Sequence, residues 1–147
     1  RNLCQTSSLE SQTRFNSMMI LVDHNLKGYI VFLRGTLAAD GWLDLLSIEF
    51  VTLEEAGLEV DASDRIIWRL AQTNSMLLLT ANRNAKGKDS LEQTIQEEGL
   101  PTSLPVLTIA SFDRLLEREY REQCCARLAD IVLFLDNYLG VNRLFIP

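Results

Sequence analysis

The stretch Met19-Ile20-Leu21-Val22-Asp23-His24-Asn25 decides the fold, because four apolar residues run directly into an acid, a histidine and an asparagine. A run this short and this apolar is typical of a parallel strand that is buried on both faces. In an open α/β sheet, ligands bind just outside the carboxyl ends of the strands. We therefore expect Asp23 to lie at the mouth of a functional crevice.

The rest of the chain alternates between short apolar runs and segments with helical spacing. Strands are predicted at residues 47–51, 76–80, 106–109 and 143–146, and helices at residues 26–39, after Ser63, at 91–98 and at 112–138. This alternation predicts an α/β fold with a central parallel sheet of four or five strands, helices on both faces and right-handed crossovers. Residues 18–147 form the single predicted domain. Residues 1–17 are polar and lack an apolar period, so we expect a loose N-terminal extension there.

The composition limits the classes of partner. A net charge of −6 argues against a surface that coats nucleic acid generally, since Lys and Arg neutralise phosphates. An enzyme that holds a cation among carboxylates can still meet nucleic acid through the metal. No stretch approaches the roughly 20 apolar residues that span a bilayer, so no membrane partner is expected. The three cysteines, two of them adjacent, are expected as free thiols in a reducing cytoplasm.

Three groups of polar residues converge at the predicted carboxyl edge of the sheet. They are Asp23, Asp64 at the start of a helix, and residues 80–84, which are followed by Asp89. Clustered acids supply the oxygen ligands that Mg²⁺ prefers, and such ions can generate a hydroxide nucleophile. Two simpler interpretations stay open: Asp64 as an exposed acid favoured by the helix dipole, and Asp89 as the N-cap of the next helix.

A local basic patch accompanies these acids. Arg83, Lys86 and Lys88 lie beside the predicted crevice in an otherwise acidic chain, which suits a phosphate backbone that passes over a metal. A solvated charged loop is the alternative.

The chain has no Gly-x-Ser-x-Gly elbow, no Gly-x-Gly-x-x-Gly after the first strand and no P-loop, so those routes to acyl transfer and nucleotide binding are excluded. The third strand ends in Thr80, where a receiver-like domain would carry the acid that is phosphorylated.

Residues 20–26, Ile-Leu-Val-Asp-His-Asn-Leu, resemble the opening strand of short PIN-like proteins, the family related to the nucleases of toxin–antitoxin pairs. Residues 53–64, 66–71 and 77–80 are similar, in order, to the middle of that family, to the helix after it and to the next strand. The resemblance covers roughly residues 18–84. It implies a three-layer α/β/α fold and, in active members, a ribonuclease that depends on Mg²⁺ or Mn²⁺. It matches Asp23 and Asp64 to two of the family's acids.

The chain departs from the family after its third predicted strand. The family usually presents Asp-x-Asp there, whereas this chain has Asn82-Arg83-Asn84. Each asparagine keeps an oxygen that can bind a metal but loses a negative charge, which weakens a hard-cation site. Asp89 compensates in part if the loop folds it back toward the crevice.

The prediction is therefore a PIN-like, Mg²⁺- or Mn²⁺-dependent endoribonuclease of weakened activity, the toxin of a toxin–antitoxin pair. The alternative is a degenerate, non-catalytic PIN-like module that binds RNA or a protein partner. Expected partners are RNA, an antitoxin or other protein, and a second copy of the chain that packs on the apolar long helix. The predicted site residues are Asp23, Asp64, Asn82 and Asn84 for catalysis, Asp23, Asp64 and Asp89 for the metal, and Arg83, Lys86 and Lys88 for substrate phosphate.

Overall fold

The computed structural model describes residues 17–81 and 87–147 and contains one five-stranded sheet in which neighbouring strands are all parallel. The strand order is β2-β1-β3-β4-β5, so the first strand lies inside the sheet. This confirms the predicted α/β class and the central parallel sheet. The strands are β1 (Ser17–Val22), β2 (Ser47–Thr52), β3 (Leu77–Thr80), β4 (Val106–Ile109) and β5 (Arg143–Ile146). The helices are α2 (Ile30–Ala39), α3 (Asp64–Thr73), α4 (Leu91–Glu98) and α5 (Arg118–Leu133), with shorter 3-10 helices η1 (His24–Tyr29), η2 (Trp42–Asp44), η3 (Phe112–Leu116) and η4 (Leu135–Tyr138).

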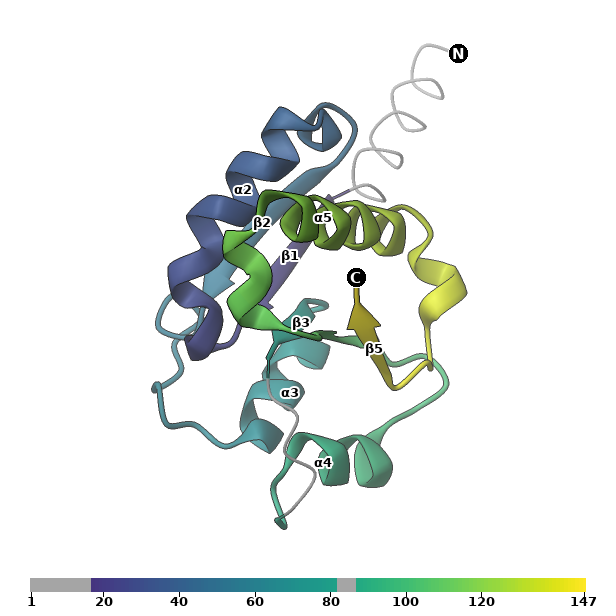
Figure 1. Ribbon diagram of the computed structural model, residues 1–147. Helices are drawn as coiled ribbons and strands as arrows, with labels where there is room; N and C mark the ends of the chain where they lie inside the picture. The colour runs from purple at the N-terminus through teal and green to yellow at the C-terminus, as the bar shows by residue number, and fades with distance from the viewer. Residues whose placement is uncertain (1–16, 82–86) are drawn as a thin grey trace, which may run out of the picture.

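Each face of the sheet is covered by its own pair of helices (Figure 1). Successive side chains of a strand point to opposite faces. Ile20 and Val22 therefore pack with α2 and α5 on one face, and Leu21 packs with α3 and α4 on the other. We call these the α2/α5 face and the α3/α4 face. The result is the expected three-layer α/β/α arrangement.

The last crossover has the opposite hand to the two before it. The connections through α3 and α4 lead from β2 to β3 and from β3 to β4 in one direction on the α3/α4 face. The connection through α5 continues in that direction from β4 to β5 but lies on the α2/α5 face. The expectation of right-handed crossovers throughout is therefore wrong. Strands are about 4.8 Å apart and a helix is about 10 Å wide, so α2 alone cannot cover five strands and α5 has to cover the rest of its face.

Most element boundaries match the sequence prediction, and the exceptions have local causes. Ser17 begins β1 and does not belong to the N-terminal extension. The predicted helix at 26–39 begins as the 3-10 helix η1. The predicted long helix at 112–138 is divided into η3, α5 and η4, because Glu117 is extended and Phe134 leaves the helical conformation. Apolar spacing of three or four residues is the same across such breaks, so periodicity does not reveal them.

Serine side chains begin both helices of the α3/α4 face. Ser63 caps α3 as predicted, since its hydroxyl accepts a hydrogen bond from the Ile66 amide at 3.3 Å. Ser90 caps α4 by accepting from the Gln93 amide at 3.2 Å, so the interpretation of Asp89 as the N-cap is wrong. Gly99 ends α4 where a Cβ atom would lie 2.5 Å from the Ile95 carbonyl oxygen, so only glycine fits.

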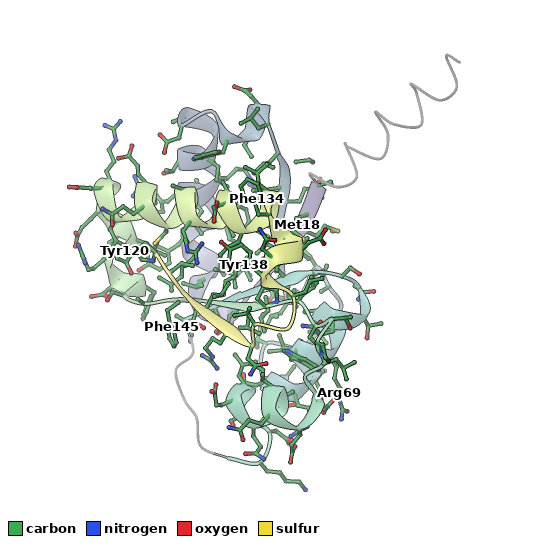
Figure 2. All side chains as sticks on the ribbon, turned by 90° about the vertical axis from the view of Figure 1, so that its right-hand side faces the viewer. Met18, Arg69, Tyr120, Phe134, Tyr138 and Phe145 are labelled. Atoms are coloured by element: carbon green, nitrogen blue, oxygen red, sulfur yellow. The ribbon has the colours of Figure 1, made fainter. Side chains whose placement is uncertain are left out.

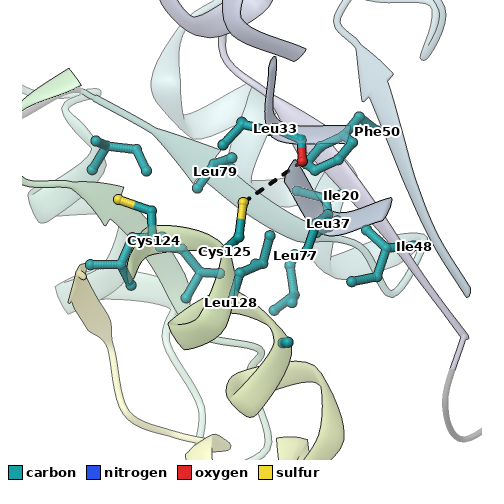
Figure 3. Packing of buried hydrophobic residues seen from close by; sticks show 14 of the residues in the cluster. Ile20, Leu33, Leu37, Ile48, Phe50, Leu77, Leu79, Cys124, Cys125 and Leu128 are labelled. Carbon is teal, nitrogen blue, oxygen red and sulfur yellow. Dashed lines mark hydrogen bonds between the residues drawn. The ribbon is translucent and has the colours of Figure 1, made fainter. Parts of the chain in front are cut away.

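The larger core lies between the sheet and the α2/α5 pair (Figure 3). Cys124 and Cys125 of α5 are buried in it as free thiols, and Cys125 donates a weak hydrogen bond to the Leu33 carbonyl at 3.7 Å. Burial raises the pKa of both thiols to about 12, so they are protonated at neutral pH and are not nucleophiles. Cys4 lies outside the described residues.

The apolar residues of α5 pack against the sheet of the same chain. Its buried residues, Tyr120, Leu128 and Ile131 among them, cover the sheet. The apolar spacing of α5 therefore gives no support to a second copy as partner. Within the described ranges, no helix has the length and hydropathy needed to cross a membrane.

Replacement of Leu77 tests the central position of β3. The side chain is 0% exposed, so Leu77→Ala removes buried methyl groups and leaves a cavity. We expect the free energy of unfolding, measured by urea titration, to fall by about 2–5 kcal/mol. Leu45→Ala, at a side chain that is 62% exposed, is the control and should change stability by less than about 0.5 kcal/mol. Equal losses in the two variants would contradict the packing described here.

Candidate functional site

Asp23 lies at the topological switch point of the sheet. β1 has β2 as its neighbour on one side and β3 on the other, and the chain runs first to β2 and then back past β1 to β3. In doubly wound sheets of this strand order, ligands bind at the carboxyl ends of the two strands that flank this point, here β1 and β3. Asp23 directly follows β1, and Thr80 is the last residue of β3. Asp23 therefore lies at the carboxyl end of an inner strand, as the sequence predicts; its functional role stays a prediction.

Neutral donors hold the half-buried Asp23 carboxylate in place. Its Oδ2 atom accepts a hydrogen bond from the Thr80 hydroxyl at 3.0 Å, and its Oδ1 atom accepts from the His24 amide at 2.8 Å. The Asp23 amide donates to the Leu79 carbonyl at 3.0 Å, which extends the ladder between β1 and β3. A carboxylate offers about four lone-pair positions, so these two bonds leave acceptor capacity for a ligand.

A row of aligned residues crosses the α3/α4 face from this aspartate. Val22 pairs with Leu79, so Asp23 lies next to Thr80; Thr80 pairs with Thr108 of β4, and Thr108 pairs with Phe145 of β5. Side chains of paired residues in parallel strands point to the same face. We call Asp23, Thr80, Thr108 and Phe145 the register row. Its two middle members are buried, at 2% and 0% exposure, and Phe145 at its far end is 52% exposed.

Arg143 places a buried positive charge beneath the register row. Its side chain is 8% exposed, and its Nη1 atom donates to the Thr108 hydroxyl at 3.2 Å. Its Nη2 atom lies 3.4 Å from a carboxylate oxygen of Glu92. Burial lowers the pKa of this guanidinium from its usual value, while the carboxylates of Glu92 and Asp64 act in the opposite direction. An arginine keeps its proton in proteins, so Arg143 is a fixed cation.

Asp64 is positioned at the start of two helices. It is the first residue of α3, and its Oδ2 atom accepts from the Leu91 amide at the first position of α4, at 3.2 Å. Both helix dipoles favour a negative charge there. The interpretation of Asp64 as an acid stabilised by helix dipoles therefore agrees with its contacts. Its carboxylate also acts electrostatically on the Arg143 guanidinium.

Asp89 and Lys88 belong to an ionic network between α3 and α4. The Arg65 guanidinium donates to Asp89 Oδ1 and to the Lys88 carbonyl, each at 2.9 Å. Arg65 also pairs with Glu97 and Glu98. Asp89 is thus directed at an arginine, and the exposed Lys88 is anchored through its backbone. Arg69, labelled in Figure 2, pairs with Glu98 as well.

The described residues do not assemble the predicted metal centre by themselves. In residues 17–81 and 87–147, no three or more His, Cys, Asp or Glu side chains gather as a metal-binding group. Asp23, Asp64 and Asp89 therefore do not form a three-carboxylate centre. The predicted residues Asn82, Arg83, Asn84 and Lys86 lie outside the described residues.

Sequence reasoning missed several members of this region. Thr108, Phe145, Arg143 and Glu92 were not predicted as site residues. A weak signal existed, because Val-Leu-Thr-Ile at 106–109 carries one hydroxyl in an apolar strand and Arg143 opens another apolar strand. Alternation alone does not reveal that these residues align with Asp23, since the register depends on strand order.

Comparisons with known proteins do not assign the chain to a family. No family model matches the chain, and no significant match was found among curated proteins or among solved structures.

The network between α3 and α4 makes a pH-dependent contribution to stability. Arg69 first, and then Arg65, lower the pKa of Glu98 to about 2 from the usual 4.5. A lowered pKa in the folded state means that the stabilisation is fully present above pH 4.5 and is lost as the pH falls toward 2. We expect Glu98→Gln to lower the urea midpoint at pH 7, and the difference from the native chain to shrink as the pH falls through this range.

Glu59→Gln, at an exposed carboxylate in the loop before α3, is the matched control and should behave like the native chain across the range. A difference for Glu98→Gln that stays constant down to pH 2 would contradict the ionic origin of the effect.

Proposed function

We propose that this chain is a Mg²⁺- or Mn²⁺-dependent endoribonuclease-like protein of the PIN type, with Asp23 as its principal metal-binding acid. The observation that carries the proposal is the position of Asp23: a half-buried carboxylate at the switch point, oriented by the Thr80 hydroxyl and with acceptor capacity to spare. This is where an α/β sheet places ligand chemistry. The resemblance of residues 20–26 to the opening strand of PIN-like proteins supports the same assignment.

The proposed ion is rich in water ligands. Mg²⁺ keeps several waters and is commonly held by one or two carboxylates, so the proposal requires only Asp23, with Asp64 as the second acid that the resemblance implies. Such an ion, when bound, supplies a hydroxide nucleophile and steadies the leaving oxygen of a phosphodiester. Thr80 orients the Asp23 carboxylate, as outer partners of metal ligands do.

The remaining predicted residues complete the proposal. Asn82 and Asn84 supply neutral oxygens in the positions where the family has acids. Asp89 does not restore the lost charge as a ligand, because its carboxylate accepts a hydrogen bond from Arg65. Arg83, Lys86 and Lys88 contact substrate phosphate. The missing charges imply weak activity. The toxin role and the antitoxin partner are proposed from the resemblance of residues 20–26 alone.

The second candidate is a non-catalytic module of the same fold that binds RNA or a protein. Two observations favour it: Asp64 is engaged with the Leu91 amide and Asp89 with Arg65, and the described residues hold no three-carboxylate group. Both candidates use the carboxyl end of β1 at Asp23 and differ in whether a divalent ion binds there.

Titration with Mn²⁺, followed by calorimetry and by paramagnetic broadening of NMR signals, separates the candidates. We expect the native chain to bind Mn²⁺ at millimolar concentration or below, and Asp23→Ala to lose at least about tenfold in affinity because a charged ligand is removed. Thr80→Val, which removes only the orienting hydroxyl, should weaken binding by about 10–100-fold. Asp136→Ala, an exposed acid of η4 at the other end of the sheet, should bind like the native chain.

Cleavage of labelled single-stranded RNA with Mn²⁺ is the second readout. Asp23→Ala, with an unchanged circular dichroism spectrum, should abolish cleavage that the native chain and Asp136→Ala share. An equally active Asp23→Ala variant would overturn the role given to this acid. Absence of Mn²⁺ binding by the native chain would favour the non-catalytic module.

A further inference from the structure

Arg143 is the least exposed cation among the ion pairs of the described residues. Its side chain is 8% exposed, and that of Arg65, the next, is 14% exposed. Moving a charge out of water is costly unless opposite charges and hydrogen bonds replace the lost hydration. The contacts of Arg143 show which groups of the chain do this.

The strand register places Arg143 beside the first turn of α4. Arg143 pairs with Val106 of β4, which packs on the α3/α4 face, so the arginine side chain points to the same face. Its Nη2 atom lies 3.4 Å from the Glu92 carboxylate, and its Nη1 atom donates to the Thr108 hydroxyl at 3.2 Å. The guanidinium is therefore held at the carboxyl end of β4 and at the start of α4.

Asp64 is attached to the same turn of α4. Its Oδ2 atom accepts a hydrogen bond from the Leu91 amide at 3.2 Å, and Leu91 directly precedes Glu92. The Arg143 guanidinium interacts with both acids: burial lowers its pKa, while Glu92 and then Asp64 act in the opposite direction. Two negative charges and one positive charge thus belong to this part of the crevice.

We propose that Arg143 is an internal cation that competes with a divalent ion for the Asp64 carboxylate and so limits metal affinity at the carboxyl end of the sheet. The guanidinium is part of the chain and keeps its charge at neutral pH, so an ion that binds Asp64 has to approach a fixed positive charge. Asp23 is held by neutral donors, the Thr80 hydroxyl and the His24 amide. This inference rests on the proposed function and names a residue that regulates its metal site.

Titration of Arg143→Met with Mn²⁺, followed by calorimetry, tests this competition. Methionine is a flexible, uncharged side chain that can fill the same space, and we expect the dissociation constant for Mn²⁺ to fall at least about tenfold. Arg143→Lys keeps the charge and should bind Mn²⁺ like the native chain. An arginine that only joins β5 to α4 would leave the affinity of Arg143→Met unchanged or lower, and that result would overturn the proposal.

Arg127→Met is the matched control. Arg127 also donates to a carboxylate and to a hydroxyl, Asp130 at 3.0 Å and Tyr138 at 2.8 Å, but it belongs to α5 on the opposite face of the sheet. Its replacement should leave the affinity for Mn²⁺ at the native value. An equal gain of affinity in Arg127→Met and Arg143→Met would assign the effect to net charge alone and reject the internal cation.

A double variant identifies the carboxylate for which Arg143 competes. Asp64→Asn should lower the affinity for Mn²⁺ more in the Arg143→Met background than in the native chain, because Arg143 no longer competes for that carboxylate. Residues that share a partner give such non-additive effects. Additive effects of the two substitutions would exclude Asp64 as the shared carboxylate and overturn the proposal.

Melting midpoints extend the test to a variant of lower stability. An ion that takes the place of Arg143 binds only the folded chain, so Mn²⁺ should raise the melting midpoint of Arg143→Met by more than that of the native chain. A variant that stays unfolded at millimolar Mn²⁺ would overturn the proposal, since the ion would then not replace the arginine.

The native chain and Arg143→Met together separate this inference from the proposed function. Binding of Mn²⁺ by the variant and not by the native chain would uphold the internal cation and reject the nuclease. Equal binding by both would reject the internal cation and leave the proposed function in place. Absence of binding by both would overturn the two proposals together.

Discussion

Burial of β1 on both faces is the constraint on which the rest of this structure depends. Ile20 and Leu21 are each 0% exposed although they point in opposite directions. A strand of this kind is stable only if helices cover both sides, so the chain has to return across the sheet on alternating faces. The α2/α5 pair and the α3/α4 pair meet this requirement.

The same constraint concentrates polar chemistry at the ends of the strands. Inside the sheet the backbone groups pair with one another, and a buried polar side chain is costly unless it is hydrogen-bonded. Thr80, Thr108 and Arg143 meet this condition by bonding within the register-row region.

The two proposed functions differ in electrostatics more than in shape. Both use the carboxyl end of β1 and β3, where Asp23 is oriented by Thr80. A nuclease needs enough negative charge near Asp23 to hold a divalent cation against its hydration. Two of the described carboxylates accept hydrogen bonds from other groups: Asp64 from the Leu91 amide at the start of α4, and Asp89 from Arg65. A binding module needs only the exposed ends of the register row.

The sequence by itself determined the α/β class, the short apolar strands and several helix boundaries, because apolar spacing and capping serines are local properties. It also located Asp23 at a strand end. The tertiary structure decided which residues join Asp23: the order β2-β1-β3-β4-β5 brings Thr108 and Phe145 into line with it. It also directed Asp89 to Arg65, a residue 24 positions away in the chain. Strand order arises from packing between distant segments, and the local spacing of apolar residues does not specify which strands become neighbours.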